Sequence, residues 1–435
     1  MKKPFWAFAA LLALPFLFAV SACEDPINDP KNDTTIVTVY DTTILPVERI
    51  DTIKTDTIIK DTLIEVSNDR VIVSYVYSGF TTIPDPFLNT NICYAFAKLD
   101  MSTDSVYQGF TVQNEMMFKK VVALKQKNPN LKIQLSFSNS AQGGGFSRMA
   151  SVPEYRKQFA QDCKTFCQER GIDGVDLDWE HPGMAYNASY LFDPYHDVDN
   201  YTALFKDIRE VFGSDYLLTY AGPDKTKEKI STGGYRYADI KAIDPYVDWV
   251  NLMCYDFCSA PKPHNAMICN DGYWDIMRTW RSYYNNGVPM EKCVLGVAFY
   301  GRHEFDNDKE WMYKDILNLY QNYSNKYRRN WDDTWKVPYM EKLVDGKWQM
   351  WCSYDDPESI AYKSQWAIKK GMHGLMYWEV EGDNNKKDLQ HACYDGMKKE
   401  AFTDTSFFYT TDTIHTMDTI ITARQDTVIT PIKRK

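Results

Sequence analysis

The residues best placed to do chemistry lie in one decapeptide, GIDGVDLDWE, at positions 171–180. If this stretch is a β-strand, its side chains alternate between two faces. One face then carries three carboxyls spaced roughly 6.5–7 Å apart along the strand, those of Asp176, Asp178 and Glu180. The opposite face is apolar and fits packing against helices, with Val175, Leu177 and Trp179.

Three carboxyls on one buried face are costly, because like charges repel and desolvation disfavours ionisation. At least one of them is expected to keep its proton near neutral pH, as a general acid in glycoside cleavage must. A solvated strand face and a hard-cation site are the alternatives. The apolar opposite face disfavours the first, and a single flat strand supplies metal ligands poorly. The pattern therefore favours catalysis, with no metal.

The stretch DGVDLDWE resembles the D-G-x-D-x-D-x-E signature of glycoside hydrolase family 18, the chitinase-type family. The resemblance extends over 70–402: NICYAFAKLD is similar to the family's second strand, LMCYDF to the sixth, VLGVAFYGR to the seventh and GLMYWEVEGD to the eighth.

This resemblance implies roles for four residues. Glu180 matches the proton donor, and Asp178 matches the carboxylate that orients the substrate's acetamido group. Asp176 matches the partner that shares a proton with Asp178, and Tyr255 matches the hydroxyl that holds the acetamido carbonyl. The implied mechanism is substrate-assisted and retaining: the acetamido oxygen attacks the anomeric carbon while Glu180 protonates the leaving oxygen.

Six further positions match residues that line the family's substrate groove: Trp378, Asp256, Met253, Tyr75, Tyr300 and Arg302. Trp378 matches the aromatic floor beneath the sugar beside the cleaved bond. For Tyr75, Tyr300 and Arg302 a packed aromatic or a satisfied surface arginine is an equal alternative.

The elements that must position these residues alternate between strand and helix. Helical spacing marks Pro153–Arg170 and Asn200–Phe212. Eight strand-helix alternations predict an α/β fold, a (β/α)8 TIM barrel over 70–402, with the chemistry at the C-terminal ends of the strands. The eight strand-like runs are Arg70–Val76, Asn91–Ala97, Lys132–Ser138, Gly174–Glu180, Tyr216–Gly222, Trp249–Tyr255, Val294–Tyr300 and Gly374–Trp378.

Two departures from the family concern the groove walls. The third strand ends Ser136-Phe137-Ser138-Asn139 where S-x-G-G is usual, which predicts a reshaped wall. Only 28 residues separate Arg302 from Trp331, room for a helix near 311–327 but not for a large inserted α+β domain. A hairpin is expected at 337–353. Without the insertion, one wall should be low and the groove open, which favours endo-acting cleavage.

The two ends of the chain are of a different composition. Residues 1–22 have the charged start and apolar run of a lipoprotein signal peptide, with Cys23 as the lipidated residue; a transmembrane anchor is the alternative. Asp-Thr units followed by a branched apolar residue recur in 23–69 and again in 403–435. We expect low-complexity segments, the first a lipid-anchored linker, and leave open whether the two pair as strands. The predicted location is the outer membrane or cell surface.

Composition limits the partners. A net charge of −10 and the lack of basic runs argue against nucleic acid, while a neutral polysaccharide suits an acidic, aromatic-rich protein. Nine cysteines follow Cys23 without a C-x-x-C pair, so we expect no catalytic thiol and no zinc site. We also expect a monomer that needs no cofactor.

The sequence thus predicts an endo-acting hydrolase of β-1,4-linked N-acetylglucosamine polymers. Cleavage of the chitobiose core of N-glycans is an alternative, although Trp179 between the two acids favours the chitinase branch. A non-hydrolytic sugar-binding lipoprotein is a second alternative. It is disfavoured because Glu180, Asp178 and Tyr255 are all present.

Overall fold

The computed structural model describes residues 34–38, 52–65, 69–138, 145–185, 190–270, 272–303, 310–398, 401–414 and 427–431. The chain divides into two compact units. One is Val66–Glu400, and the other combines the two ends, Met1–Glu65 and Ala401–Lys435. None of the described helices is long and apolar enough to cross a membrane. Residues 1–22 and Cys23, which bear on the predicted signal peptide and lipidation, lie outside the described residues.

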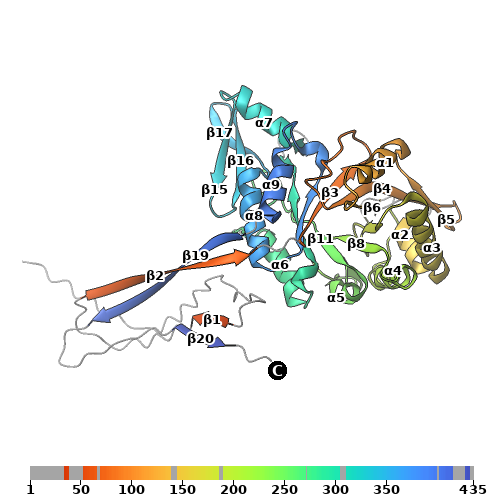
Figure 1. The fold of residues 1–435 in the computed structure, drawn as a ribbon, viewed down its shortest axis with the longest axis horizontal. Helices are drawn as coiled ribbons and strands as arrows, with labels where there is room; N and C mark the ends of the chain where they lie inside the picture. The colour runs from red at the N-terminus through yellow and green to blue at the C-terminus, as the bar shows by residue number, and fades with distance from the viewer. Residues whose placement is uncertain are drawn as a thin grey trace, which may run out of the picture. The chain divides into compact units, whose positions relative to one another are not determined.

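Eight parallel strands close into a barrel, which confirms the predicted fold (Figure 1). Each strand pairs in parallel with the next, and the eighth pairs with the first. In chain order the strands are β3 (Val71–Tyr77), β4 (Asn91–Met101), β6 (Lys132–Ser138), β7 (Gly174–Asp178), β8 (Leu217–Gly222), β11 (Trp249–Leu252), β12 (Cys293–Ala298) and β18 (Gly374–Trp378). An additional strand, β5 (Tyr107–Val112), lies antiparallel to β4.

The helices lie around this barrel and in its loops. They are α1 (Glu115–Val122), α2 (Gly145–Ser151), α3 (Pro153–Arg170), α4 (Asp197–Phe212), α5 (Ile240–Ile243), α6 (Ile276–Asn285), α7 (Tyr313–Asn322), α8 (Pro357–Lys369) and α9 (Asp388–Lys398). The short hairpin of β9 (Glu228–Lys229) and β10 (Tyr235–Arg236) follows β8.

Local sequence explains how the chain enters β7. Proline at the first position of α3 has a backbone suited to a helix start, and Gly171 ends the helix with φ of 65°, a left-handed conformation that favours glycine. Gly174 then begins the strand. A β-carbon there would lie 2.0 Å from the carbonyl oxygen of Leu217, so the neighbouring strand β8 can approach only glycine.

The connection after the seventh barrel strand holds an insertion. Five antiparallel strands and helix α7 occupy the connection between β12 and α8, in the order β14-β13-β17-β16-β15. The strands are β13 (Tyr300–Arg302), β14 (Glu310–Met312), β15 (Tyr327–Asp332), β16 (Val337–Val344) and β17 (Lys347–Ser353). The barrel strand β12 stops at Ala298, so Tyr300 belongs to this sheet. Figure 1 shows the insertion beside α8 and α9.

The expectation that no large α+β insertion fits here was therefore wrong. The expectation of a low groove wall, which depended on it, was wrong as well. The count of residues between Arg302 and Trp331 omitted the strands on either side, which supply most of the sheet. The hairpin at 337–353 is present, and Asp345 and Gly346 at its turn both have positive φ, as a type I′ turn requires.

The question left open about the two chain ends is answered in the second unit. Strand β2 (Thr52–Glu65) pairs antiparallel with β19 (Ala401–Ile414) over fourteen residues, from Thr52 opposite Ile414 to Glu65 opposite Ala401. A shorter pair joins β1 (Thr34–Thr38) to β20 (Thr427–Pro431).

Candidate active site

The first carboxyl of the fourth strand, that of Asp176, lies inside the barrel and is not exposed. Four side chains from four other strands donate to it. Tyr75 Oη and Ser136 Oγ lie 2.8 and 2.7 Å from Oδ2. Thr219 Oγ1 and Asn251 Nδ2 lie 2.6 and 3.3 Å from Oδ1. Burial raises the pKa of Asp176, and these hydrogen bonds oppose the rise.

The second and third carboxyls form a pair at the barrel mouth. Asp178 is 6% exposed and hydrogen bonds to Glu180, whose side chain is 40% exposed. Burial, then the charges of Glu180 and Asp176, raise the pKa of Asp178 well above its usual range. Burial and the charge of Asp256 raise the pKa of Glu180, against the hydrogen bond from Asp178 and the charge of Arg302. The pair therefore retains a proton that can lie on either carboxyl.

Asp178 also presents an unused acceptor. Its Oδ1 atom is buried and has no hydrogen-bond partner among the described residues. Because a buried polar atom without a partner is costly, this oxygen is suited to accept an N–H from a bound molecule. Asp176 already accepts hydrogen bonds from four donors. In this structure Asp178 is hydrogen-bonded to Glu180 and not to Asp176. The predicted sharing of a proton between Asp176 and Asp178 stays a prediction.

An aromatic floor lies across the barrel from these acids. Trp378, at the end of β18, stacks on Phe96 with ring centroids 5.8 Å apart and an interplanar angle of 22°. Trp378 and Tyr255 both pack on the cluster of buried side chains that fills the barrel. The Tyr255 hydroxyl donates to the weakly accepting sulfur of Met376, at 3.6 Å. Met253, predicted to line the site, lies just after β11 and is half-buried.

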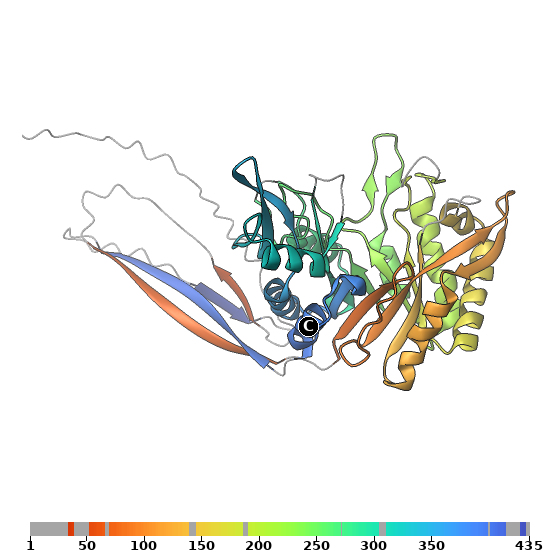
Figure 2. The same ribbon diagram turned by 90° about the horizontal axis from the view of Figure 1, so that it is seen from above.

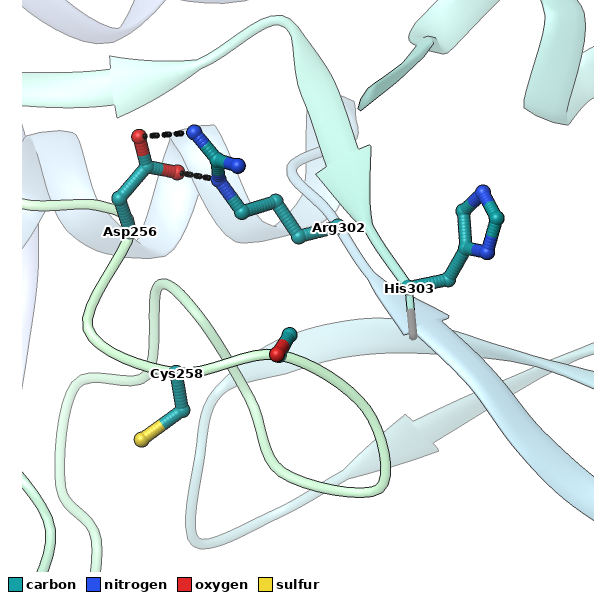
Figure 3. Close-up of a pocket in the computed structure, with 5 residues that line it drawn as sticks. Asp256, Cys258, Arg302 and His303 are labelled. Atoms are coloured by element: carbon teal, nitrogen blue, oxygen red, sulfur yellow. Dashed lines mark hydrogen bonds and ion pairs between the residues drawn. The ribbon is translucent and has the colours of Figure 1, made fainter. Parts of the chain in front are cut away.

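One side of the mouth is formed by Asp256, in the loop after β11, and by the insertion (Figure 3). Arg302 Nη2 lies 2.8 Å from Asp256 Oδ2, and Arg302 Nε also donates to the carboxyl. Tyr300 Oη donates to Asp256 Oδ1 at 2.7 Å. Desolvation would raise the pKa of Asp256, but the hydrogen bonds from His264 and Arg302 outweigh it and lower that pKa. Asp256 is thus held as a carboxylate.

A cavity of about 350 Å³ opens beside this ion pair (Figure 3). It is lined by Asp256, Cys258, Ser259, Arg302 and His303. Of the residues predicted to touch sugar, Arg302 lies at this cavity. Tyr75 and Tyr300 are instead 1% and 2% exposed, and each hydroxyl is bound to a carboxylate. In this structure both tyrosines are packed aromatics whose hydroxyls donate to carboxylates, Tyr75 to Asp176 and Tyr300 to Asp256.

Sequence reasoning missed the partners of Asp176 from the third, fifth and sixth strands. Thr219 and Asn251 were detectable as single polar residues at inward positions of their strands, whereas Ser136 lies in a strand in which Gln134 and Ser138 are polar as well. Ser136 is also the retained first residue of the altered third-strand motif. Asn139, which follows β6, lies outside the described residues. Cys163 and Cys167 are buried in α3, and burial raises the pKa of the Cys167 thiol to about 12, which disfavours a thiolate.

Comparison with known proteins identifies the family of the chain. The profile of glycosyl hydrolases family 18 matches residues 70–383. The chain belongs to this family. Chitinase A1 of Niallia circulans is 35% identical over 307 residues, covering 60% of this chain and 42% of that protein. Chitinase 63 of Streptomyces plicatus is 28% identical, covering 74% of this chain and 54% of that one. The chain therefore spans about half the length of these curated relatives of family 18.

Among solved structures of the family, the group IV chitinase of Ostrinia furnacalis in complex with allosamidin superposes with a TM-score of 0.62. It is 25% identical, and the match covers 75% of this chain and 98% of that one. The barrel, with the acids in and just after β7, thus lies within the part of the chain that matches this family.

Proposed function

We propose that the protein is a chitinase-type glycosidase that hydrolyses β-1,4-linked N-acetylglucosamine polymers, chitin or chitooligosaccharides, with retention of configuration. The observation that carries this proposal is the proton-sharing pair of Asp178 and Glu180 at the barrel mouth, opposite Trp378. A carboxyl that keeps its proton near neutral pH is the general acid that glycoside cleavage requires.

The nucleophile is the substrate's own acetamido oxygen. An ordinary retaining glycosidase holds its two carboxyls about 5–5.5 Å apart, with the second free to attack the anomeric carbon. Here Asp178 is in hydrogen-bond contact with Glu180, and Asp176 is enclosed by four donors. Asp256 is held by Arg302. These four described carboxyls thus leave the attack to the substrate.

Each side chain then has one task. Glu180 gives its proton to the leaving oxygen and later takes one from water. Asp178, whose Oδ1 lacks a partner, accepts the acetamido N–H and stabilises the positive charge that develops there. The Tyr255 hydroxyl, which is bonded only weakly to the Met376 sulfur, donates to the acetamido carbonyl. Trp378 carries the apolar face of the sugar.

Cleavage within the chain, rather than removal of terminal sugars, is supported by what lies beyond Trp378. The sequence analysis inferred this mode of cleavage from a low groove wall, and the insertion makes that argument invalid. However, Tyr77 is 36% exposed with its ring 6.2 Å from that of Trp378, and Phe96 stacks on the same tryptophan. This aromatic surface continues past the sugar beside the cleaved bond, so several sugars can lie on it.

The test is a product profile by mass spectrometry on chitin oligomers, colloidal chitin and a high-mannose glycoprotein, with the unsubstituted protein and Glu180→Gln. Internal cleavage of the oligomers by the unsubstituted protein alone is expected. Equal turnover by Glu180→Gln would refute the assignment of the acid. Release of the glycan from the glycoprotein, without cleavage of chitin oligomers, would instead favour action on N-glycan chitobiose cores. Binding without any product would favour a sugar-binding protein.

We also propose that the protein is exported and anchored as a bacterial lipoprotein through Cys23, at the outer membrane or cell surface. The support is the charged start, apolar run and small residues that precede this cysteine. Cys23→Ser should move the protein from the membrane fraction to the soluble fraction of cells. An unchanged membrane fraction would contradict lipidation at this position.

A further inference from the structure

A buried histidine contacts Asp256 on both its backbone and its side chain. His264 lies in the loop between β11 and α6, and its side chain is fully buried. The Nδ1 atom of its ring accepts the Asp256 N–H at 3.3 Å and lies 3.4 Å from the Asp256 Oδ1 atom. A single ring nitrogen therefore fixes where this residue begins and where its carboxyl lies.

Asp256 needs such support because its backbone is strained. Its φ is 60°, a left-handed conformation that few residues other than glycine adopt and that persists only where the surroundings hold it. Two consecutive N–H groups of this turn end on His264. The Asp256 N–H donates to Nδ1, and the Phe257 N–H donates to the His264 carbonyl at 3.0 Å. His264 thus holds the turn that presents the Asp256 carboxyl to the barrel mouth.

The other ring nitrogen argues against a role in packing alone. The Nε2 atom of His264 is buried and has no hydrogen-bond partner among the described residues. A buried polar atom without a partner costs stability, so an apolar ring would fill this space better. The contacts of Nδ1 with Asp256 are what histidine supplies here.

His264 is itself fixed from outside its own loop. Its N–H donates to Ser353 Oγ at 2.8 Å, and its ring meets that of Tyr300 with centroids 5.2 Å apart, both residues of the insertion. The carbonyl of the next residue accepts the Lys363 ammonium at 2.9 Å, and Lys363 is paired with Asp355 at 2.7 Å. Figure 2 shows the insertion, in teal and blue, on the side of the barrel away from the yellow helices α2 and α3.

The position of the Asp256 carboxylate matters because its charge acts on the acid. After burial, the charge of Asp256 is what raises the pKa of Glu180. The energy between two charges depends on the distance that separates them. A shift of the turn at Asp256 therefore changes how firmly Glu180 holds its proton.

The other titratable groups around Glu180 do not replace this effect. Asp178 hydrogen-bonds to it, and Arg302 carries the opposite charge. His181 Nε2 lies 3.8 Å from Glu180 Oε2, but burial lowers the pKa of His181 to about 4, so this ring is neutral near pH 7. Burial raises the pKa of Tyr255 well above its usual range, so its hydroxyl keeps its proton.

We infer that His264 is a positioning residue for the cleavage reaction. It holds the left-handed turn at Asp256 and so keeps this carboxylate where Glu180 retains the proton that it gives to the leaving oxygen. This inference rests on the proposed function.

The test is the pH profile of kcat/KM on chitotetraose for the full chain with His264→Phe, which keeps a ring but removes Nδ1. At the pH optimum kcat/KM should fall by about tenfold, because the carboxylate is misplaced. The basic limb of the profile should also move to lower pH by about half a unit or more, since a displaced Asp256 raises the pKa of Glu180 less.

Two further variants separate this role from a structural one. In His264→Asn the side-chain oxygen lies as many bonds from the backbone as Nδ1 does, so the basic limb should return toward its original position. His373→Phe is the matched control, because His373 precedes β18 at the opposite end of the barrel from the mouth. It should leave the basic limb in place. A thermal melt of each variant reports any loss of stability separately.

An unmoved basic limb in His264→Phe would overturn the inference, whatever that variant loses in stability or rate. A limb displaced equally in His264→Asn would also overturn it. If His264→Phe does not fold, Ser353→Ala decides, because it removes the acceptor of the His264 N–H and should move the limb in the same direction; no movement overturns the inference. If the unsubstituted protein does not cleave chitotetraose, the proposed function itself fails, which is a separate result.

Discussion

Residues in and just after β7 have different roles on the two faces of the strand: one face packs against a helix and the other carries the carboxyls. Trp179 points outward and stacks on Phe146 of α2 with ring centroids 5.4 Å apart, as the alternation predicts. The carboxyls of Asp176 and Asp178 point inward, where burial raises the pKa of both. Their surroundings differ, however. Four donors surround Asp176, whereas Asp178 has a second carboxyl as its partner.

Asp178→Asn should lower kcat on chitooligosaccharides by at least about a hundredfold, because the amide cannot stabilise a positive acetamido group as a carboxylate can. The folded structure should remain, since the substitution is isosteric. Steady-state kinetics with a thermal melt of each protein checks this. Activity close to that of the original protein would show that the acetamido group is held elsewhere.

Glu379 predicts a pH dependence of stability that is separate from catalysis. It is 3% exposed, and burial raises its pKa from 4.5 to about 7. The folded protein therefore binds more protons than the unfolded chain between these pH values, so stability falls as pH rises through that window. Glu379→Gln removes this titration.

The free energy of unfolding of the original protein, relative to Glu379→Gln, should accordingly fall by up to about 3 kcal/mol from pH 4.5 to pH 7. Denaturant unfolding of both proteins across this range measures it. Parallel curves for the two proteins would mean that Glu379 titrates in the folded state as it does in the unfolded chain.

Strands and helices carry the next set of constraints. The approach of β8 to Gly174 leaves no room for a side chain, and a β-carbon at Gly374 in β18 would likewise lie 1.9 Å from the Val71 carbonyl oxygen. Glycine at these points lets the barrel close with its neighbouring strands in register. The insertion then brings Arg302 of β13 to Asp256.

Gly174→Ala should destabilise the protein by about 3 kcal/mol or more, because the added methyl collides with the backbone of β8 and the strands must separate. Gly171→Ala is the matched control three residues earlier. A β-carbon at Gly171 would meet no atom within 4 Å. The alanine should therefore cost only about 1–2 kcal/mol of stability, from the strain of a left-handed backbone. Thermal or denaturant unfolding distinguishes them, and equal losses would contradict the packing explanation.

At the scale of the whole molecule, the repeats at the two ends are joined as strands. Their pairing places the ends of the chain in one unit while the barrel keeps its own core. The described C-terminal strands β19 and β20 therefore have defined partners in the N-terminal segment, β2 and β1.

Truncation after Glu400 removes β19 and should leave β2 without its partner. The melting temperature of the barrel should not change, since Val66–Glu400 is a separate compact unit. Protease cleavage within 52–65, mapped by mass spectrometry, should become faster because a strand without a partner is readily cleaved. Unchanged cleavage in the truncated protein would mean that the pairing does not protect this segment.

The sequence by itself determined the features that depend on local period. Alternation by two in 171–180 and the strand-helix order from 70 onward indicated the barrel and the inward carboxyls, because each strand must bury one face whatever its neighbours are. The bounds of α3 also followed from the proline at its start and the glycine at its end.

Only the tertiary structure decided which groups meet. The donors to Asp176 lie 40 to 101 residues away in the chain, and Arg302 lies 46 residues from Asp256. The insertion was misjudged because its sheet joins strands from both sides of the 303–330 segment, and only the tertiary structure shows that they pair. Contacts between distant segments depend on register and closure, and these are properties of the assembled barrel rather than of any single stretch.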